Sequence, residues 1–289
     1  MNRTRRAARC GFFFAFAFAL AARQANGAEA DVLARVRAQG VVRCATIVRP
    51  GVAVPTVDGA HWYGIAPDVC RAVAAAVLGD PTRVKLRPYL ENEAGAVGAA
   101  ADDDIVFLSG NESIATLARD RATLQLGPAV MHDALAVLVP ASSAAARIAD
   151  LAGKKVCVEP GTPADRALVR AFARRGIALR EHPFQESDEM RQAYGTGNCD
   201  ALAGPLTTLA NVRSDPSEGR PADRILPELL ADDPIFAATG GDARWSRIVW
   251  WTFSVLVDAE EAGISGSDAA RAAAIPGVPP LAGRQLGLA

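Results

Sequence analysis

Histidine is scarce in this 289-residue chain, and positive charge is not in excess. The three histidines, His61, His132 and His182, do not stand at metal-ligand spacing from one another or from a cysteine. The 31 basic residues are balanced by 32 acidic ones, whereas nucleic acids and anionic membrane surfaces select basic patches. The sequence also lacks the Gly-x-Ser-x-Gly turn of a serine hydrolase. We therefore expect no metal, no cofactor and no nucleic-acid partner.

Long apolar runs are missing too, except near the start of the chain. Four arginines among the first nine residues precede an almost pure run of Phe, Ala and Leu over 10–22. That run is shorter than the roughly 20 residues that span a bilayer. Small residues at 25–27 offer a cleavage point, with Ala28 as the new first residue. The pattern predicts a cleavable signal peptide over 1–27 and secretion, with a retained membrane anchor as the alternative.

Cysteine is sparse and falls into separated pairs. Cys10 lies in the predicted signal, which leaves Cys44 and Cys70 in the first third and Cys157 and Cys199 in the middle. An even number of cysteines behind an export signal predicts disulfides. Four cysteines allow three connectivities. Pairing nearest neighbours would place one bridge in each half of a two-lobed molecule.

The remaining chain is long enough for two domains. Loss of residues 1–27 would leave about 262 of the 289 residues. It would remove five of the basic residues and none of the acidic ones, which gives a net charge of about −6. Half of the residues are apolar, with much alanine. This composition is typical of packed helices rather than of a disordered chain.

Strand-like and helix-like segments alternate in the first half of the chain. Runs rich in β-branched or apolar residues at 41–48, 84–88 and 104–108 predict strands. Helices are predicted at 68–78 and, more weakly, at 93–101. Strands and helices that alternate with short joins imply a parallel sheet covered by helices.

The alternation restarts in the second half. Strands are expected at 134–139, 155–158, 177–180 and 200–203, and helices at 162–175, 188–195 and 245–262. We therefore expect an α/β protein of two lobes, each a mainly parallel sheet flanked by helices. Lobe 1 would comprise 28–131 and 232–289, and lobe 2 would comprise 132–231. Segments near 128–137 and 229–238 would form a two-strand hinge beside a cleft.

Several stretches carry a family resemblance. They are Val41–Cys44, Gly64–Pro81, Lys155–Thr162, Cys199–Ala201, Ile225–Glu228 and Trp250–Ser265. Together they cover nearly all of the chain beyond the signal, and they resemble the periplasmic amino-acid-binding proteins of ABC importers. This family is solute-binding protein family 3, and the general L-amino-acid-binding branch is the most similar.

The resemblance implies a fold, a pairing of cysteines and a partner. The fold would be the type II periplasmic-binding-protein fold, in which two lobes close over one small carboxylate-containing ligand, an amino acid or an organic acid. The disulfides would be Cys44–Cys70 and Cys157–Cys199. The partner would be an ABC permease in the inner membrane, and the location would be the periplasm.

The resemblance also implies two anchors for a ligand carboxylate. Thr116 and Arg119 match the family's Thr-x-x-Arg motif, whose arginine binds the carboxylate through two parallel hydrogen bonds. A solvated arginine at a helix start is the alternative. Gly161 and Thr162 match the second anchor, a helix start whose free N–H groups favour anions. Helix capping alone is the alternative there.

The partner for a ligand ammonium departs from the family pattern. The family's acidic residue falls at Pro205, which offers neither charge nor N–H. Glu112 is a candidate replacement from the other lobe, or else a solvent-exposed loop charge. A buried ammonium without an anion costs several kcal/mol, so an organic acid becomes an alternative ligand. Ser113, beside Glu112, and Trp62, before the first bridged helix, complete the candidate set.

Three kinds of function remain open. The first is a solute-binding protein of an ABC importer, which needs no catalytic group. The second is an accessory or sensing protein with a degenerate site. The third is a dehydratase-like enzyme, with Glu112 and His132 as candidate groups. We expect the first, and no catalytic residues. The pair Trp250–Trp251 is expected to pack on the last predicted helix rather than to bind a ligand.

Overall fold

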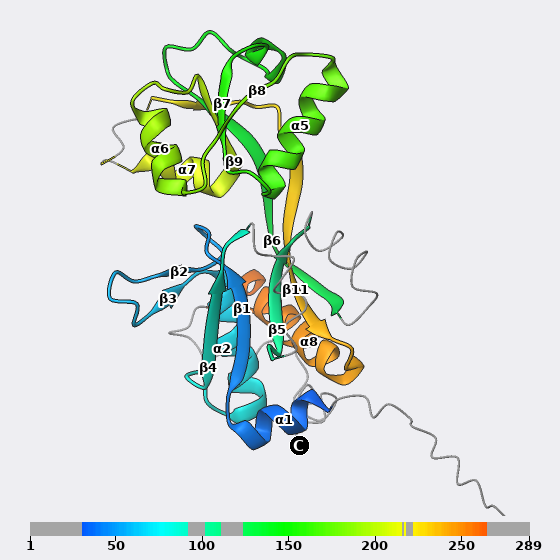
Figure 1. Cartoon of the computed structure of the whole chain (residues 1–289). Coiled ribbons are helices and arrows are strands. Elements are labelled where there is room, and N and C mark those ends of the chain that lie inside the picture. Colours follow the sequence, from blue (N-terminus) through cyan, green and yellow to red (C-terminus); the bar gives the residue numbers. More distant parts are fainter. Residues whose placement is uncertain (1–30, 92–101, 111–123, 216, 218–221, 265–289) are drawn as a thin grey trace, which may run out of the picture.

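The computed structural model describes residues 31–91, 102–110, 124–215, 217 and 222–264. The elements form two groups that are connected by two long strands (Figure 1). The predicted signal peptide over 1–27 and the weak helix expected at 93–101 lie outside the described residues.

The first lobe is built on three parallel strands. β1 (Val42–Ile47) lies between β4 (Val84–Tyr89) and β5 (Ile105–Ser109) and is parallel to both. The lobe also contains α1 (Val32–Gln39), β2 (Val54–Pro55), β3 (Trp62–Tyr63), α2 (Ile65–Leu78) and α8 (Ala243–Glu261). Helix α2 begins directly after Gly64, which has a φ of 125°. A Cβ at this position would lie 2.3 Å from the carbonyl oxygen of Val52, so only glycine fits.

The second lobe repeats this layout. β7 (Lys155–Val158) is parallel to β8 (Arg180–Pro183) on one side and to β9 (Ala201–Pro205) on the other. The remaining elements are η2 (Ile148–Leu151), α5 (Pro163–Arg175), α6 (Ser187–Gly195), α7 (Leu206–Ser214) and β10 (Arg224–Ile225). Two separate apolar clusters cover the sheet. One contains Leu168 and Phe172 of α5, and the other contains Met190 and Tyr194 of α6. Because successive strand residues point to opposite faces, the lobe has a core on each side of its sheet.

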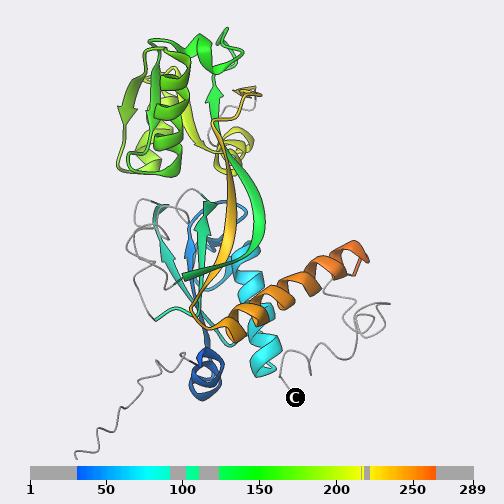
Figure 2. The ribbon, with the colours of Figure 1, turned by 90° about the vertical axis from the view of Figure 1, so that its right-hand side faces the viewer.

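Two antiparallel strands, β6 (Leu124–Val139) and β11 (Ala231–Gly240), connect the lobes. β11 pairs with β5 and β6 pairs with β9, so the strand order is β4-β1-β5-β11-β6-β9-β7-β8. Figure 2 shows the two strands side by side between the lobes. The predicted two-lobed α/β fold with a two-strand hinge is confirmed. The predicted lobe boundaries after residues 131 and 231 fall within these strands and stay predictions.

Two predicted strands have different limits in the structure. The strand expected at 134–139 begins ten residues earlier, because its pairing with β11 continues to Leu124. The strand expected at 177–180 lies at Arg180–Pro183, where Arg180 pairs with Lys155 of β7. In both places the partner strand sets the limits of the element, and the apolar pattern of the segment alone does not.

Helix α8 does not follow the expectation for its tryptophan pair. Trp245, Ile248 and Val249 are buried, as the helical period requires. Trp250 and Trp251 point elsewhere and are 48% and 56% exposed. The same period that turns one side of α8 into the core turns these two rings toward solvent, so the expectation that they pack was wrong.

Both predicted disulfides are present. Cys44 of β1 is bonded to Cys70 of α2, and Cys157 of β7 is bonded to Cys199, two residues before β9. All four cysteines are buried. The bridges close loops with sequence separations of 26 and 42. In the chain-entropy account they contribute about 3.5 and 4 kcal/mol to stability. Each bridge lies within one lobe.

A buried arginine ties the hinge together. Arg49 follows β1, is 1% exposed, and places its Nε 2.6 Å from Glu91 Oε1. Its Nη1 lies 2.9 Å from Asp233 Oδ2 and 3.4 Å from Asp133 Oδ2. These two aspartates are paired residues of β11 and β6. Asp133 also accepts a hydrogen bond of 2.7 Å from the Thr207 hydroxyl of α7. The network thus runs from lobe 1 through both hinge strands into lobe 2.

The charge of Arg49 is maintained in this buried position. Burial alone would lower the pKa of Arg49, but the adjacent carboxylates, Glu91 foremost and then Asp233 and Asp133, outweigh burial and raise the pKa above its ordinary value. The guanidinium is therefore the permanent counter-charge of the hinge aspartates.

We predict that Arg49→Met destabilises the protein by about 3–5 kcal/mol, because it leaves carboxylates buried without a counter-charge. Urea unfolding followed by circular dichroism measures the change. Arg83→Met is the matched control, since Arg83 pairs with Asp80 on the exposed surface, where ion pairs contribute little to stability. Equal losses for the two variants would contradict the role of Arg49.

Candidate ligand-binding site

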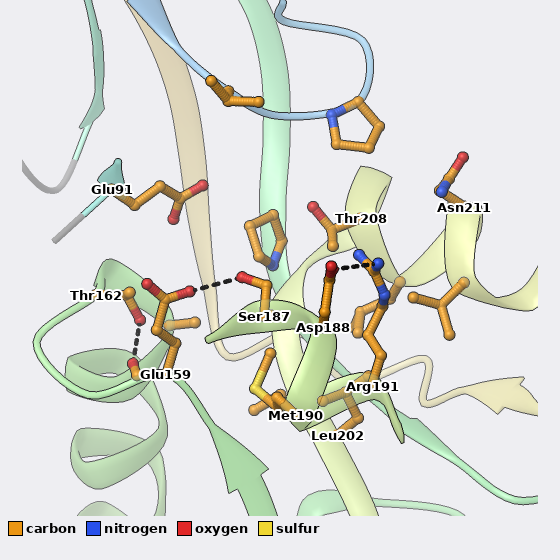
Figure 3. Close-up of a pocket in the computed structure, with 18 of the residues that line it drawn as sticks. Glu91, Glu159, Thr162, Ser187, Asp188, Met190, Arg191, Leu202, Thr208 and Asn211 are labelled. Atoms are coloured by element: carbon orange, nitrogen blue, oxygen red, sulfur yellow. Dashed lines mark hydrogen bonds and ion pairs between the residues drawn. The ribbon is translucent and has the colours of Figure 1, made fainter. Parts of the chain in front are cut away.

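A cavity of about 400 Å³ lies between the two lobes. Its lining includes Pro50, Leu90 and Glu91 from lobe 1 and Glu159, Thr162, Ser187, Asp188, Arg191, Pro205 and Thr208 from lobe 2. Figure 3 shows side chains from both lobes facing this space. The volume is in the range of small-molecule sites, which usually lie in clefts between domains.

The cavity lies at the carboxyl ends of parallel strands. Glu91 lies two residues beyond β4, Glu159 directly follows β7, and Pro205 ends β9. Helices α5, α6 and α7 begin beside it, which brings Thr162, the cap of α5, to its wall. In parallel sheets the strand ends and the following helix starts meet at one edge, and ligands bind in the crevice there.

The start of α5 already has its own carboxylate. The Thr162 hydroxyl accepts a hydrogen bond of 3.3 Å from the Asp165 backbone N–H and donates one of 2.7 Å to the Glu159 carbonyl. The Asp165 carboxylate accepts a hydrogen bond of 2.8 Å from the Gly161 N–H. The capping that the sequence predicts is therefore confirmed. The Gly161 N–H therefore already has a carboxylate partner, and the roles of Gly161 and Thr162 as ligand-binding residues stay predictions.

Glu159 is the least compensated acid of the cavity. Its Oε2 accepts a hydrogen bond of 3.1 Å from the Ser187 hydroxyl, and no ion pair joins it to a basic residue in the part of the chain that the structure describes. Burial raises the pKa of Glu159 above its ordinary value, the Ser187 hydrogen bond partly offsets the effect, and the charges of Glu91 and Glu186 add to it. An opposite charge entering the cavity would stabilise this carboxylate.

The other acids that line the cavity have basic partners. Glu91 accepts the 2.6 Å hydrogen bond from Arg49 described above. Asp188 pairs with Arg191 one turn along α6, at 2.6 Å. Figure 3 shows the Glu91 and Glu159 side chains one above the other at the left, with the Asp188–Arg191 pair to the right of them. The described residues contain no cluster of three or more His, Cys, Asp or Glu side chains suited to a metal ion.

The predicted site residues have different outcomes. Thr162 lines the cavity, and Gly161 precedes it on the loop before α5. Trp62 is not among the described lining residues. It packs half-buried against the core of lobe 1, and its carbonyl accepts a hydrogen bond from Arg71. Glu112, Ser113, Thr116 and Arg119 lie outside the described residues. Their roles as ligand-binding residues stay predictions.

Two other expectations concern Pro205 and His132. Pro205, the position where the family pattern has an acid, does line the cavity. His132 is exposed on β6, and its paired residue on β11 is Pro234. It is not among the described lining residues, which does not support a catalytic role for it.

Sequence reasoning missed Glu91 and Glu159 as site residues. For Glu159 a signal was present, because this acid directly follows a strand and directly precedes the Pro160–Thr162 turn at a helix start. Carboxyl ends of strands are where parallel sheets place functional groups. For Glu91 the signal was weaker, because two residues separate this acid from the strand predicted at 84–88.

Comparison with known proteins identifies the family. The general L-amino acid-binding periplasmic protein AapJ of Rhizobium johnstonii is 32% identical over 247 residues, which cover 83% of this chain and 70% of that protein. The glutamate/glutamine/aspartate/asparagine-binding protein BztA of Rhodobacter capsulatus is 31% identical over 262 residues, 89% of this chain and 75% of that protein. No protein-family model matches the sequence.

Solved structures agree with this. A periplasmic binding protein of an ABC transporter from Brucella ovis, with glutathione bound, has a TM-score of 0.74 at 28% identity, and the match covers 90% of this chain and 84% of that one. The cysteine-binding protein of Campylobacter jejuni has a TM-score of 0.61 at 19% identity over 80% and 89% of the chains, which shows a shared fold. None of the described helices combines the length and apolar composition of a membrane span. The chain belongs to the family of periplasmic amino-acid-binding proteins of ABC transporters.

Proposed function

We propose that the interlobe cavity captures an amino acid or a related carboxylate-containing solute and presents it to an ABC permease, without chemical turnover. The observation that carries the proposal is a cavity walled by both lobes, which β6 and β11 connect. Relatives named for binding L-amino acids, and a similar structure with glutathione bound, support this class of ligand.

The hinge supports a mechanism of capture by closure. A solute that contacts Glu91 on one side and Glu159 or Thr162 on the other bridges the lobes and favours the state in which they lie together. The Arg49 network holds the base of the hinge, because it joins β6 and β11 at one pair of residues.

We expect a thermal-shift screen of the mature chain against the L-amino acids, organic acids and cyclic carboxylates to identify a stabilising ligand. At one hundred times its Kd, a ligand adds about 2.7 kcal/mol of stability, which corresponds to a rise in Tm of about 5–10 °C for a protein of this size. Isothermal titration calorimetry then gives the affinity, and chromatography of the mixture shows whether the ligand is recovered unchanged.

The cavity itself is tested by Thr208→Trp, which places an indole on the wall that α7 contributes. We expect this variant to lose the thermal shift, while Ser214→Trp, on an exposed position of the same helix, keeps it. A shift that survives in Thr208→Trp would place the ligand elsewhere. A recovered product would support an enzyme, and the absence of any shift would support an accessory or sensing role.

We propose that the protein reaches the periplasm by a signal peptide cleaved after Gly27. Export requires a basic start, an apolar run and small residues, and the sequence has each of them. The intact mass of protein recovered from a periplasmic extract should correspond to a chain that begins at Ala28. A chain expressed from Ala28 without the signal is the control and should stay in the cytoplasm. Recovery of full-length protein in the membrane fraction would indicate a retained anchor instead.

A further inference from the structure

Pro205 stands where the family pattern has an acid, and a different acid, Glu159, lies beside it. β7 and β9 are adjacent strands, and Cys157 pairs with Leu202 in their register. Their carboxyl ends therefore lie side by side, with Glu159 beyond β7 and Pro205 at the end of β9. Both residues line the cavity from the same lobe.

We propose that Glu159 binds the ammonium group of the ligand in place of the acid that Pro205 replaces. The solute is then one with a primary ammonium group, such as an α-amino acid, and not an organic acid without nitrogen. This inference rests on the proposed function, because it assigns one contact within the site of capture.

The charges around the cavity single out Glu159. Glu91 has Arg49 at 2.6 Å and Asp188 has Arg191 at 2.6 Å, so neither requires a counter-charge from a ligand. Among the described residues no basic group pairs with Glu159. A partly buried carboxylate without a counter-ion is unfavourable, and an ammonium that enters the cavity supplies the missing charge.

Glu159 is also held in position. Its carbonyl accepts the Thr162 hydroxyl at 2.7 Å and its carboxylate accepts the Ser187 hydroxyl at 3.1 Å. It directly follows the buried Val158, next to the bridged Cys157. Such a fixed group loses little conformational freedom when a ligand binds, which favours affinity. A solvent-exposed acid on a loop has no comparable constraints.

Matched pairs of ligands test the inference. The probes are L-alanine with L-lactate, L-leucine with L-2-hydroxyisocaproate, and L-glutamate with L-2-hydroxyglutarate, which differ only in an ammonium or a hydroxyl group. Isothermal titration calorimetry at pH 7.5 should show binding of at least one amino acid by the mature wild-type chain, with the paired hydroxy acid weaker. Glu159→Gln should weaken that amino acid about 10- to 100-fold, since charged hydrogen bonds have that effect.

Two further variants make the result specific. Glu159→Asp keeps the charge and should retain the preference for amino acids over hydroxy acids. Glu189→Gln removes an exposed acid from α6 that is not among the described lining residues, and it should leave all affinities within about threefold, as surface charges do. Equal affinity of wild-type protein for both members of each pair, or undiminished amino-acid binding by Glu159→Gln, would overturn the inference and leave the proposed function standing. Binding of no amino acid or organic acid by the wild type would instead reject the proposed function.

Stability of the ligand-free protein provides a second readout. The groups that face Glu159 are Glu91 from the end of β4, Glu186 and Ser187 at the start of α6, and Thr162 at the start of α5. Burial and the two neighbouring acids raise the pKa of Glu159 in the folded state. The folded protein therefore takes up this proton more readily than the unfolded chain does, and stability is lost when the pH rises through the folded pKa.

It follows that Glu159→Gln should have a higher Tm than the wild type at pH 7.5 without ligand. The difference should shrink as the pH falls through the folded pKa of Glu159, because the wild-type side chain then becomes neutral as well. Differential scanning calorimetry between pH 4 and 8 measures this. A lower Tm for Glu159→Gln at pH 7.5 would mean that Glu159 is already compensated in the free protein and would contradict its proposed role.

Discussion

The buried guanidinium of Arg49 is the constraint on which the arrangement of the two lobes depends. Asp133 and Asp233 are directly opposite each other on antiparallel strands, where like charges repel. Arg49 lies between them and Glu91, and its charge makes that pairing tolerable. The hinge strands can therefore carry two buried acidic side chains opposite each other, and lobe 1 supplies the counter-charge that holds them there.

The site follows from the same architecture. Each lobe has parallel strands whose carboxyl ends face the other lobe, so acids and helix starts gather in one space. Within that space the charges are unevenly compensated: the acid nearest the hinge is neutralised by Arg49, whereas Glu159 is not paired with a described basic residue. Glu91 thus belongs both to the Arg49 network and to the cavity wall, whereas the Glu159 carboxylate is available to a charged group of a solute.

The sequence was sufficient for the fold because its signals are local and repeated. Alternating strands and helices with short joins predicted two α/β lobes, and the two pairs of cysteines lie within them. The limits of β6 and β8 were not predictable, because they are set by pairing with β11 and β7. The exposure of Trp250 and Trp251, by contrast, follows from the helical period of α8, which places Trp245, Ile248 and Val249 in the core.

The site was predicted less well than the fold, for a physical reason. Thr162 was recognised because capping is local. The hydrogen bond from the Gly161 N–H to the Asp165 carboxylate was not predicted. Glu91 and Glu159 are 68 positions apart in the chain and meet across a cavity only because two lobes fold separately and then face each other. Arg49 was not singled out, because its partners Asp133 and Asp233 are distant in sequence.

The order of the strands has a consequence for how the chain acquires its structure. β5 is buried along its whole length, yet one of its two neighbours, β11, lies more than a hundred residues later in the sequence. Until residues 231–240 arrive, β5 presents an unpaired apolar edge, and such edges recruit other chains. Lobe 2 is contiguous in sequence and can form meanwhile. A chain that folds from its N-terminus therefore passes through a period in which an edge of its first lobe is open to pairing with another chain.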